Sequence, residues 1–390
     1  MKATSLQKDP IFKTLPYWKR ERGRRYFPWK FWTPIHQILC STEKRWIEMK
    51  GKAFLGLLLF LIMFTVPFLS IGAKIPDKTD KLKKAASSVP LAKPQQQSVA
   101  PGTKSAVSGF KILDTKSNTV ITADDRSFLY GAIVTEMSPD FHPEALKAQG
   151  VAAYTYYSRL REQQRSNPTA SLKGADFAAD TQGWQIYVTK EQMKQRWGAN
   201  FDTYYNKLTK VVDAIYGKVL KSDGELADAT YYAISSGNTE TSEDIWGGKR
   251  KYLVAVASPG DVFASGYQTT ATFSTAQFKA AVLKTAPKAN LSGDPSTWVG
   301  NIQRTASGTI KNIQIGGVNI KGSDIRSAFA LRSPNFSISY ANGTFTFLVK
   351  GYGHGVGMSQ VGANYMASQG ASYQQILAWY YPTTTLTTLH

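Results

Sequence analysis

Hydrophobic and polar positions divide the chain into a long apolar run, two polar flanks and a mixed C-terminal region. The apolar run is residues 53–72, AFLGLLLFLIMFTVPFLSIG, and it holds no charged side chain. Twenty helical residues rise about 30 Å, which is the thickness of the hydrocarbon core of a bilayer. We therefore predict one transmembrane helix at Ala53–Gly72. A cleaved signal peptide is the alternative, since Ile71-Gly72-Ala73 is compatible with cleavage, but the apolar stretch and the extension before it are long for one.

The two polar flanks of this run are basic. Residues 1–52 carry 13 Lys and Arg against 4 Asp and Glu, and residues 72–107 carry 7 against 2. Basic residues just before a span favour a cytoplasmic N-terminus. We expect residues 1–52 to be a basic cytoplasmic segment and residues 73–107, rich in Lys, Pro, Ser and Gln, to be a disordered linker. The protein is then a single-pass protein of the cell membrane whose C-terminal domain faces the periplasm or the cell wall.

Residues 108–390 mix helical and strand patterns, which predicts one α+β domain of helices and short antiparallel strands with an inserted β-rich lobe. Pro143 marks the start of a helix whose buried positions repeat at seven residues. Asn342-Gly343 indicates a hairpin turn. The other expected helices are residues 202–221, 358–369 and 373–381, and the expected strands are 227–235, 252–257 and several short ones within 300–350.

Composition excludes several classes of function. The net charge of +20 is concentrated around the apolar run and no stacking motif accompanies it, so we predict no nucleic-acid partner. The single cysteine, Cys40, precedes the span, which leaves the C-terminal domain without disulfides. No His-Glu-x-x-His motif, paired histidines or cysteine cluster is present, so we expect neither a metal site nor a cofactor.

Three places in the C-terminal domain combine polar chemistry with unusual local sequence. Glu136 ends an apolar run before a proline-marked turn, where partial desolvation would keep its carboxyl protonated; a solvated glutamate is the alternative. His354 lies in GYGHGVGMSQ (351–360), whose alternate glycines give bare backbone that suits close approach of a polar substrate; a structural turn is the alternative. Residues 235–248 supply groups that bind sugars, Ser236 and Thr239 among them, although this is also ordinary loop composition.

Taken together, these segments resemble the SpoIID/LytB family, the stage II sporulation protein D group of cell-wall proteins. The resemblance rests on three blocks in family order between about Gly109 and the C-terminus. They are YGAIVTEM (130–137) continuing into PEALKAQGVAA (143–153), residues 235–248, and a last block from Arg332-Ser333 through GYGHGVGMSQ to Tyr380-Tyr381-Pro382.

The resemblance implies a lytic transglycosylase that cleaves the glycan strands of peptidoglycan, preferably strands stripped of stem peptides by an amidase. Glu136 matches the family's catalytic glutamate, Lys147 a lysine of its active-site cleft, and His354 and Gln360 its glycine-rich block. Glu136 would protonate the glycosidic oxygen and then accept a proton from the C6 hydroxyl of the muramic acid, leaving a 1,6-anhydro end. A non-catalytic glycan-binding enhancer of a partner amidase is the alternative.

The sequence departs from the family pattern at three positions. Tyr154 stands where the family usually has an arginine, Tyr232-Ala233-Ile234 replaces a common His-Ser-Thr, and Trp379 replaces a frequent histidine. Asp140 and Glu144 lie near Glu136 in sequence, so a hydrolase that uses two carboxyls is a further alternative.

Overall fold

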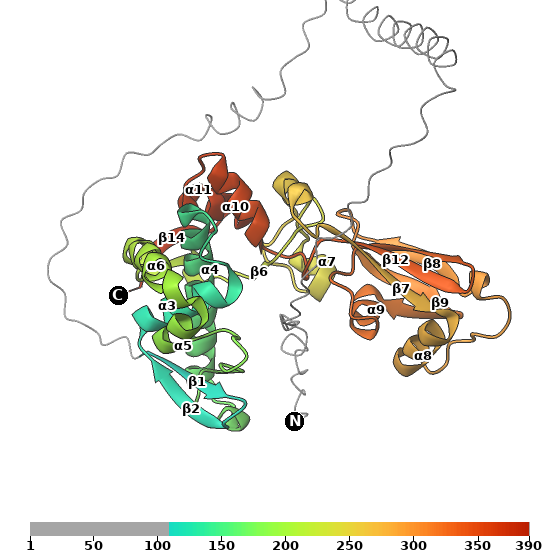
Figure 1. The fold of residues 1–390 in the computed structure, drawn as a ribbon, viewed down its shortest axis with the longest axis horizontal. Helices are drawn as coiled ribbons and strands as arrows, with labels where there is room; N and C mark the ends of the chain where they lie inside the picture. The colour runs from blue at the N-terminus through green and yellow to red at the C-terminus, as the bar shows by residue number, and fades with distance from the viewer. Residues whose placement is uncertain (1–108, 390) are drawn as a thin grey trace, which may run out of the picture. The chain divides into compact units, whose positions relative to one another are not determined.

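The computed structural model describes residues 109–389, which form two hydrophobic cores (Figure 1). Among these residues no helix is both long and apolar enough to cross a membrane. The predicted cytoplasmic segment, the predicted transmembrane helix Ala53–Gly72 and the predicted linker all lie outside the described residues. The class is mixed α and β, as predicted.

The first core is built around one long helix, α4. This helix contacts α3, α6, α10 and α11 along its length, as Figure 1 shows. Gly150 on α4 lies in close packing, since a Cβ there would lie 2.3 Å from Ile215 Cδ1 and would displace that side chain. The elements of this core are β1 (Phe110–Asp114), β2 (Thr119–Ala123), α3 (Asp125–Glu136), α4 (Pro143–Ser166), β3 (Phe177–Ala179), α5 (Lys190–Trp197), α6 (Phe201–Ile215), β4 (Lys218–Ser222), β5 (Glu225–Leu226), β6 (Tyr231–Tyr232), β13 (Met358–Ser359), α10 (Gln360–Ser368), α11 (Tyr373–Tyr380) and β14 (Thr385–Thr388).

The second core corresponds to the predicted β-rich insertion. Two antiparallel three-stranded sheets, β10-β9-β8 and β11-β12-β7, surround an aromatic cluster in which the rings of Phe278 and Phe345 stack at 3.7 Å. The predicted hairpin turn is confirmed, because Asn342 and Gly343 both adopt positive φ between β11 and β12. The elements are β7 (Gln268–Ser274), α8 (Thr275–Thr285), β8 (Val299–Arg304), β9 (Ile310–Ile315), β10 (Val318–Lys321), α9 (Gly322–Ala328), β11 (Phe336–Ala341) and β12 (Thr344–Lys350).

Several predicted boundaries are wrong. The helix predicted at 202–221 ends at Ile215, because Gly217 adopts φ +73° and the chain continues as strand β4. Of the strand predicted at 227–235 only β6 forms, and it pairs in parallel with β13 rather than antiparallel. Residues 252–257 form no strand; instead the Thr239 hydroxyl donates to Val254 O and accepts from Val256 N–H. These side-chain hydrogen bonds take the place of the regular backbone hydrogen bonds between two strands.

The two ends of α3 lie in different surroundings. At its start, the buried Asp125 carboxylate accepts a 2.8 Å bond from Arg161 Nη1 and a 2.6 Å bond from the Tyr154 hydroxyl. The Arg161 guanidinium also lies over the Phe110 ring, 4.1 Å from its centroid. This charge pair is therefore sealed within the first core, and removal of either partner leaves an uncompensated buried charge.

We expect Arg161→Leu to lower the free energy of unfolding by about 3–5 kcal/mol, because Asp125 would then be a buried, unpaired carboxylate. Arg126→Leu is the matched control, since Arg126 pairs with Asp213 on the surface and exposed ion pairs contribute about 0–1 kcal/mol. Chemical denaturation of the two variants measures the difference. Equal losses would contradict a structural role for the Asp125–Arg161 pair.

Candidate active site

Three segments far apart in the sequence meet at the C-terminal end of α3. Glu136 is the last residue of this helix, and its Oε2 accepts a 3.3 Å bond from Gln360 Nε2 at the start of α10. The same Gln360 amide lies 3.5 Å from Gln149 Oε1 on α4. Gln149 is fully buried, and its own Nε2 has no partner among residues 109–389. A buried amide nitrogen without a protein partner is uncommon, because burial of an unpaired polar group is costly.

The Glu136 carboxyl is held in conditions that favour its protonated form. Burial raises its pKa, and the bond from Gln360 only partly opposes the effect. The residue as a whole is nevertheless half-buried and keeps some exposure to solvent. A carboxyl that is desolvated yet reachable fits a general acid that works near neutral pH. Of the two alternatives considered for Glu136, the geometry thus favours the desolvated carboxyl over the solvated one.

Two tyrosines complete the surroundings of Glu136. Tyr157 on α4 and Tyr231 on β6 share a hydrogen bond, and burial raises the pKa of both hydroxyls well above the ordinary value. The negative charge of Glu136 also raises both pKa values, so both rings lie within electrostatic reach of the carboxyl. Both therefore remain neutral hydrogen-bonding groups at physiological pH.

A buried carboxylate, Asp261, holds Gln360 in place. Its Oδ1 accepts from the Ser235 amide at 3.0 Å and from the Ser359 hydroxyl at 2.6 Å, and its Oδ2 accepts from the Ser258 hydroxyl. Ser359 is the N-cap of α10, the helix that begins with Gln360. Asp261 therefore joins the 235–248 segment to the glycine-rich block and sets the position of the amide against Glu136.

His354 is bonded inside the glycine-rich block. Its Nδ1 accepts from the Val356 amide at 3.1 Å, which leaves the proton on Nε2 to donate to Tyr231 O, also at 3.1 Å. Burial, with a contribution from Arg326, lowers the pKa of His354 to about 4. A neutral imidazole with both nitrogens engaged matches the structural alternative for this residue, and its contact with Tyr231 connects it to the Glu136 surroundings.

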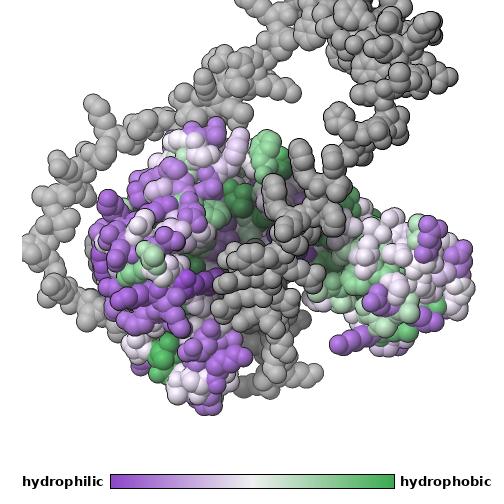
Figure 2. Space-filling view, viewed as in Figure 1, coloured by the Kyte–Doolittle hydropathy of each residue, from purple (hydrophilic) through white to green (hydrophobic). Residues whose placement is uncertain are grey.

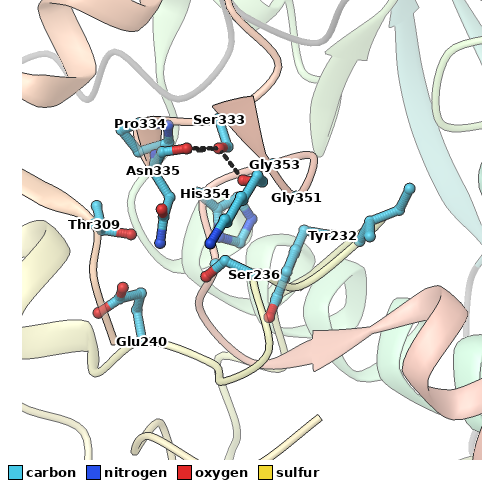
Figure 3. Close-up of a pocket in the computed structure, with 13 residues that line it drawn as sticks. Tyr232, Ser236, Glu240, Thr309, Ser333, Pro334, Asn335, Gly351, Gly353 and His354 are labelled. Carbon is cyan, nitrogen blue, oxygen red and sulfur yellow. Dashed lines mark hydrogen bonds between the residues drawn. The ribbon is translucent and has the colours of Figure 1, made fainter. Parts of the chain in front are cut away.

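The remaining predicted residues are dispersed. Ser236 and His354 line a small pocket with Tyr232 and Glu240, shown in Figure 3. At about 10 Å³ it accommodates no more than a water molecule. Thr239 is fully buried and its hydroxyl is used by the backbone, so it has no free group for a sugar.

Lys147 lies on α4, two residues before Gln149, and it borders a depression on the surface. Its Nζ pairs with Glu144 Oε1 at 2.6 Å and lies 5.9 Å from the centre of the Tyr373 ring. Glu144 Oε2 also accepts from the Tyr373 amide at 2.8 Å, which ties α4 to α11. Lys147 and Glu144 therefore act as a pair at the start of α4.

Sequence reasoning missed four residues of the site, namely Gln149, Tyr157, Tyr231 and Asp261. Gln149 carried a signal, because a glutamine on the buried stripe of a helix needs a polar partner. Tyr231 lies on the short strand β6 and Asp261 in the turn at 259–263, and neither belongs to a motif that marks a functional residue. Within residues 109–389, no group of three or more His, Cys, Asp or Glu side chains is arranged to hold a metal ion.

Comparison with known proteins finds a matching family model and several relatives. Residues 114–221 match the model of a family described as stage II sporulation protein. The stage II sporulation protein D of Bacillus amyloliquefaciens is 36% identical over 268 residues, which cover 68% of this chain and 75% of the relative. The chain belongs to the stage II sporulation protein D family. The Bacillus subtilis member is 35% identical over 65% of this chain and 71% of its own length.

A second type of relative is more distant. The amidase enhancer of Bacillus subtilis is 28% identical over 308 residues, covering 66% of this chain but only 40% of that protein. This stage II sporulation protein D family member is therefore also similar, at lower identity, to a protein named amidase enhancer.

The residues of this family member that depart from the family pattern lie in different surroundings. The Tyr154 hydroxyl bonds to Asp125 at the start of α3, and eleven helical residues place Asp125 about 16 Å from Glu136. Tyr154 is thus part of the core and not of the Glu136 site. Trp379 donates from Nε1 to Ala257 O at 2.9 Å. The centroid of the Tyr232 ring lies 5.4 Å from that of the His354 ring.

The pKa shift of Glu136 predicts how stability depends on pH. Because its pKa is raised by folding, the stability from this group is fully present below the ordinary pKa and is lost as the pH rises through the raised value. Glu136→Gln cannot ionise, so we expect its stability relative to wild type to improve as the pH rises above the ordinary pKa of a glutamate. Thermal unfolding at a series of pH values measures this trend.

Glu144→Gln is the control, because its stability relative to wild type should change with pH in the opposite direction. Burial alone would raise the pKa of Glu144, but bonds from Lys147 and the Tyr373 amide lower it. The stability that Glu144 contributes is therefore present above the ordinary pKa and is lost as the pH falls. The free energy of unfolding of Glu144→Gln should accordingly fall relative to wild type as the pH rises. If the stability difference between Glu136→Gln and wild type did not change with pH, Glu136 would be solvated like an ordinary glutamate.

We expect the His354 imidazole to remain neutral, with its proton on Nε2, from about pH 5.5 to about pH 8, because its pKa is lowered to about 4. Nitrogen chemical shifts of the ring, measured by NMR, report both the charge and the tautomer. A titration midpoint near the ordinary histidine value would show that the ring is solvated and available to substrate.

Proposed function

We propose that the protein is a peptidoglycan lytic transglycosylase in which Glu136 is the general acid and base. The main support is the state of this carboxyl: it is desolvated, partly accessible and bonded to the amide of Gln360. Within residues 109–389, no neighbouring carboxylate contributes to its pKa shift. A single carboxyl is what an intramolecular transglycosylation requires, whereas common glycosidases place two carboxyls across the bond.

In the first step the protonated Glu136 donates its proton to the glycosidic oxygen. The bond between this oxygen and the anomeric carbon of the muramic acid breaks, and positive charge develops at that carbon. The negative charge of the Glu136 carboxylate that remains after proton transfer stabilises the positive charge on the anomeric carbon. Gln360 Nε2, 3.3 Å from Glu136 Oε2, stabilises the carboxylate that forms.

In the second step the carboxylate accepts the proton of the C6 hydroxyl of the same sugar. The C6 oxygen then bonds to the anomeric carbon, so no water is consumed and the product has a 1,6-anhydro end. Glu136 returns to its protonated form. Because the attacking C6 hydroxyl and the anomeric carbon belong to one sugar, correct positioning of that sugar supplies much of the rate acceleration.

Hydrolysis with a second carboxyl is less well supported. Glu144 is ion-paired with Lys147 and accepts from the Tyr373 amide. Asp140 accepts a bond from the Ser138 hydroxyl on the exposed loop after α3. Neither carboxylate contributes to the pKa shift of Glu136, as a partner across the scissile bond would be expected to do.

A non-catalytic enhancer of an amidase is the second candidate, favoured by the amidase enhancer relative. In that case the site would bind glycan without cleaving it, and Glu136 would act only as a hydrogen-bonding group. The basic flanks and apolar run at Ala53–Gly72 support a membrane-anchored protein under both proposals, with a cytoplasmic N-terminus and a cell-wall-facing domain.

The test is to incubate the detergent-solubilised full chain with amidase-stripped and intact glycan strands and to identify products by mass spectrometry. We expect 1,6-anhydro-muramic ends from stripped strands. Loss of general acid–base catalysis costs roughly 10²–10⁴-fold, so Glu136→Gln should reduce the rate by at least this factor. Glu162→Gln, an exposed glutamate on α4, is the matched control.

The products separate the candidate functions. Reducing ends that have gained water would overturn the transglycosylase in favour of a hydrolase. Binding of glycan with no cleavage by the wild-type protein would leave the enhancer function.

A further inference from the structure

Two arginines of the inserted lobe, which contains the second core, meet beside Tyr352 of the glycine-rich block. The Arg332 guanidinium lies over the Tyr352 ring, 4.3 Å from its centroid. Arg326, on α9, donates from Nε to Leu331 O at 3.3 Å, so it reaches the residue next to Arg332. Burial raises the pKa of Tyr352 and both arginine charges oppose that rise, which places both within electrostatic reach of one hydroxyl. The two guanidinium groups therefore form one cluster.

Neither guanidinium has an acidic partner in the part of the chain that the structure describes. The Nε atom of Arg332 is buried without a hydrogen-bond partner, and this side chain makes no ion pair within residues 109–389. Arg326 has a lowered pKa because burial desolvates it, and its Nε donates to a neutral carbonyl. Asp324 is two positions away on α9, and side chains two apart on a helix do not face each other. Partly buried charges without a counter-charge are costly, so an anion bound here would be favoured.

The arginines are reachable, and a glycine leaves space beside them. Arg326 and Arg332 are both half-buried rather than enclosed. Gly266 adopts φ +81°, and a Cβ at this position would lie 2.6 Å from Arg332 Nη1. The Gly353 amide donates to Arg332 O at 3.0 Å, so the glycine-rich block fixes the backbone from which this guanidinium extends. The cluster is thus held by backbone contacts and is open to a small ligand.

The inserted lobe is basic as a whole. Residues 265–350 hold 9 Lys and Arg against 2 Asp and Glu. Figure 2 shows that hydrophilic residues dominate the visible surface of the helical part of the molecule, whereas the visible surface of the lobe mixes hydrophobic and hydrophilic residues. Few acidic groups of the lobe can offset its positive charge, and an approaching anion therefore meets an attractive field.

We propose that Arg326 and Arg332 form a binding site for a phosphate dianion, carried either by free inorganic phosphate or by a phosphorylated sugar. Each guanidinium offers a planar fork of N–H donors that matches two oxygens of a carboxylate or a phosphate. A carboxylate, with its single charge, is satisfied by one fork. A phosphate monoester has three terminal oxygens and a charge of about −2, so it matches two forks and neutralises both arginines. The site shares no residue with the surroundings of Glu136, and the inference does not depend on glycan cleavage.

The experiment observes the arginine Nε–H groups by NMR in the detergent-solubilised full chain. Inorganic phosphate, glucose 6-phosphate, glucose and acetate are added in turn at constant ionic strength and about pH 7.5, where the phosphates are largely dianions. We expect each phosphate to shift the signals of Arg326 and Arg332 together along one saturable curve. Acetate and glucose should saturate neither signal in the same concentration range.

Arg326→Lys and Arg332→Lys assign the two signals and test the fork, because lysine keeps the positive charge but lacks the planar pair of donors. We expect Arg332→Lys to weaken phosphate binding, followed at the Arg326 signal, by about tenfold or more, since hydrogen bonds to charged groups are strong. Arg196→Lys is the matched control, because Arg196 is an exposed arginine that also lies over an aromatic ring, that of Trp184, at 4.0 Å. It should leave the phosphate affinity unchanged.

The outcomes test the site and separate the two sources of phosphate. Tighter binding of glucose 6-phosphate than of inorganic phosphate would identify a sugar-linked phosphate as the ligand, and equal affinities would identify free phosphate. The absence of a saturable shift, an equal affinity for acetate, or an unchanged phosphate affinity in Arg332→Lys would overturn the site. Because glycan cleavage is not measured, this result is independent of the proposed transglycosylase.

Discussion

The site depends on one buried carboxylate, that of Asp261. This side chain is fully buried and accepts hydrogen bonds from the backbone of Ser235 and from two serine hydroxyls, Ser258 and Ser359. Those groups belong to the 235–248 segment, to the turn after it and to the N-cap of α10. Burial of such a group is costly unless its hydrogen bonds are complete, so the three segments are held together. The position of Gln360 against Glu136 follows from this constraint.

Glu136 shows how tertiary packing gives chemistry to an ordinary residue. Its carboxyl is placed by the end of α3, desolvated by α4 and β6, and bonded by an amide from α10. The apolar run before residue 136 indicated partial desolvation, but the contributions of α4, β6 and α10 come from other parts of the chain and are not visible in the local sequence. The raised pKa suits an acid, and the nearby amide and tyrosine hydroxyls are neutral partners that tolerate both charge states of the carboxyl.

Element types were predictable where a strong local signal exists. Pro143 after His142 begins α4 because proline fixes φ near the helical value, and Asn342-Gly343 forms the hairpin between β11 and β12 because both residues tolerate the positive φ of the turn. The prediction failed where side chains compete with the backbone ladder. The Thr239 hydroxyl bonds to the carbonyl oxygen of Val254 and to the amide of Val256, two backbone groups that a strand would have paired with another strand. Similarly, the helical pattern of α6 continues into residues 218–221, and only the conformation of Gly217 ends it.

By itself the sequence determined the chemical inventory of the site: one carboxyl at position 136, the lysine at 147, and the glycine-rich block around His354 and Gln360. Tertiary structure decided what each does. It brought Gln360 to Glu136, enclosed His354 in bonds to Val356 and Tyr231, buried Thr239, and added Gln149, Tyr157 and Tyr231 to the surroundings of Glu136. The reason is physical. Residue types are local, but desolvation and hydrogen-bond geometry are created only when separate segments pack together.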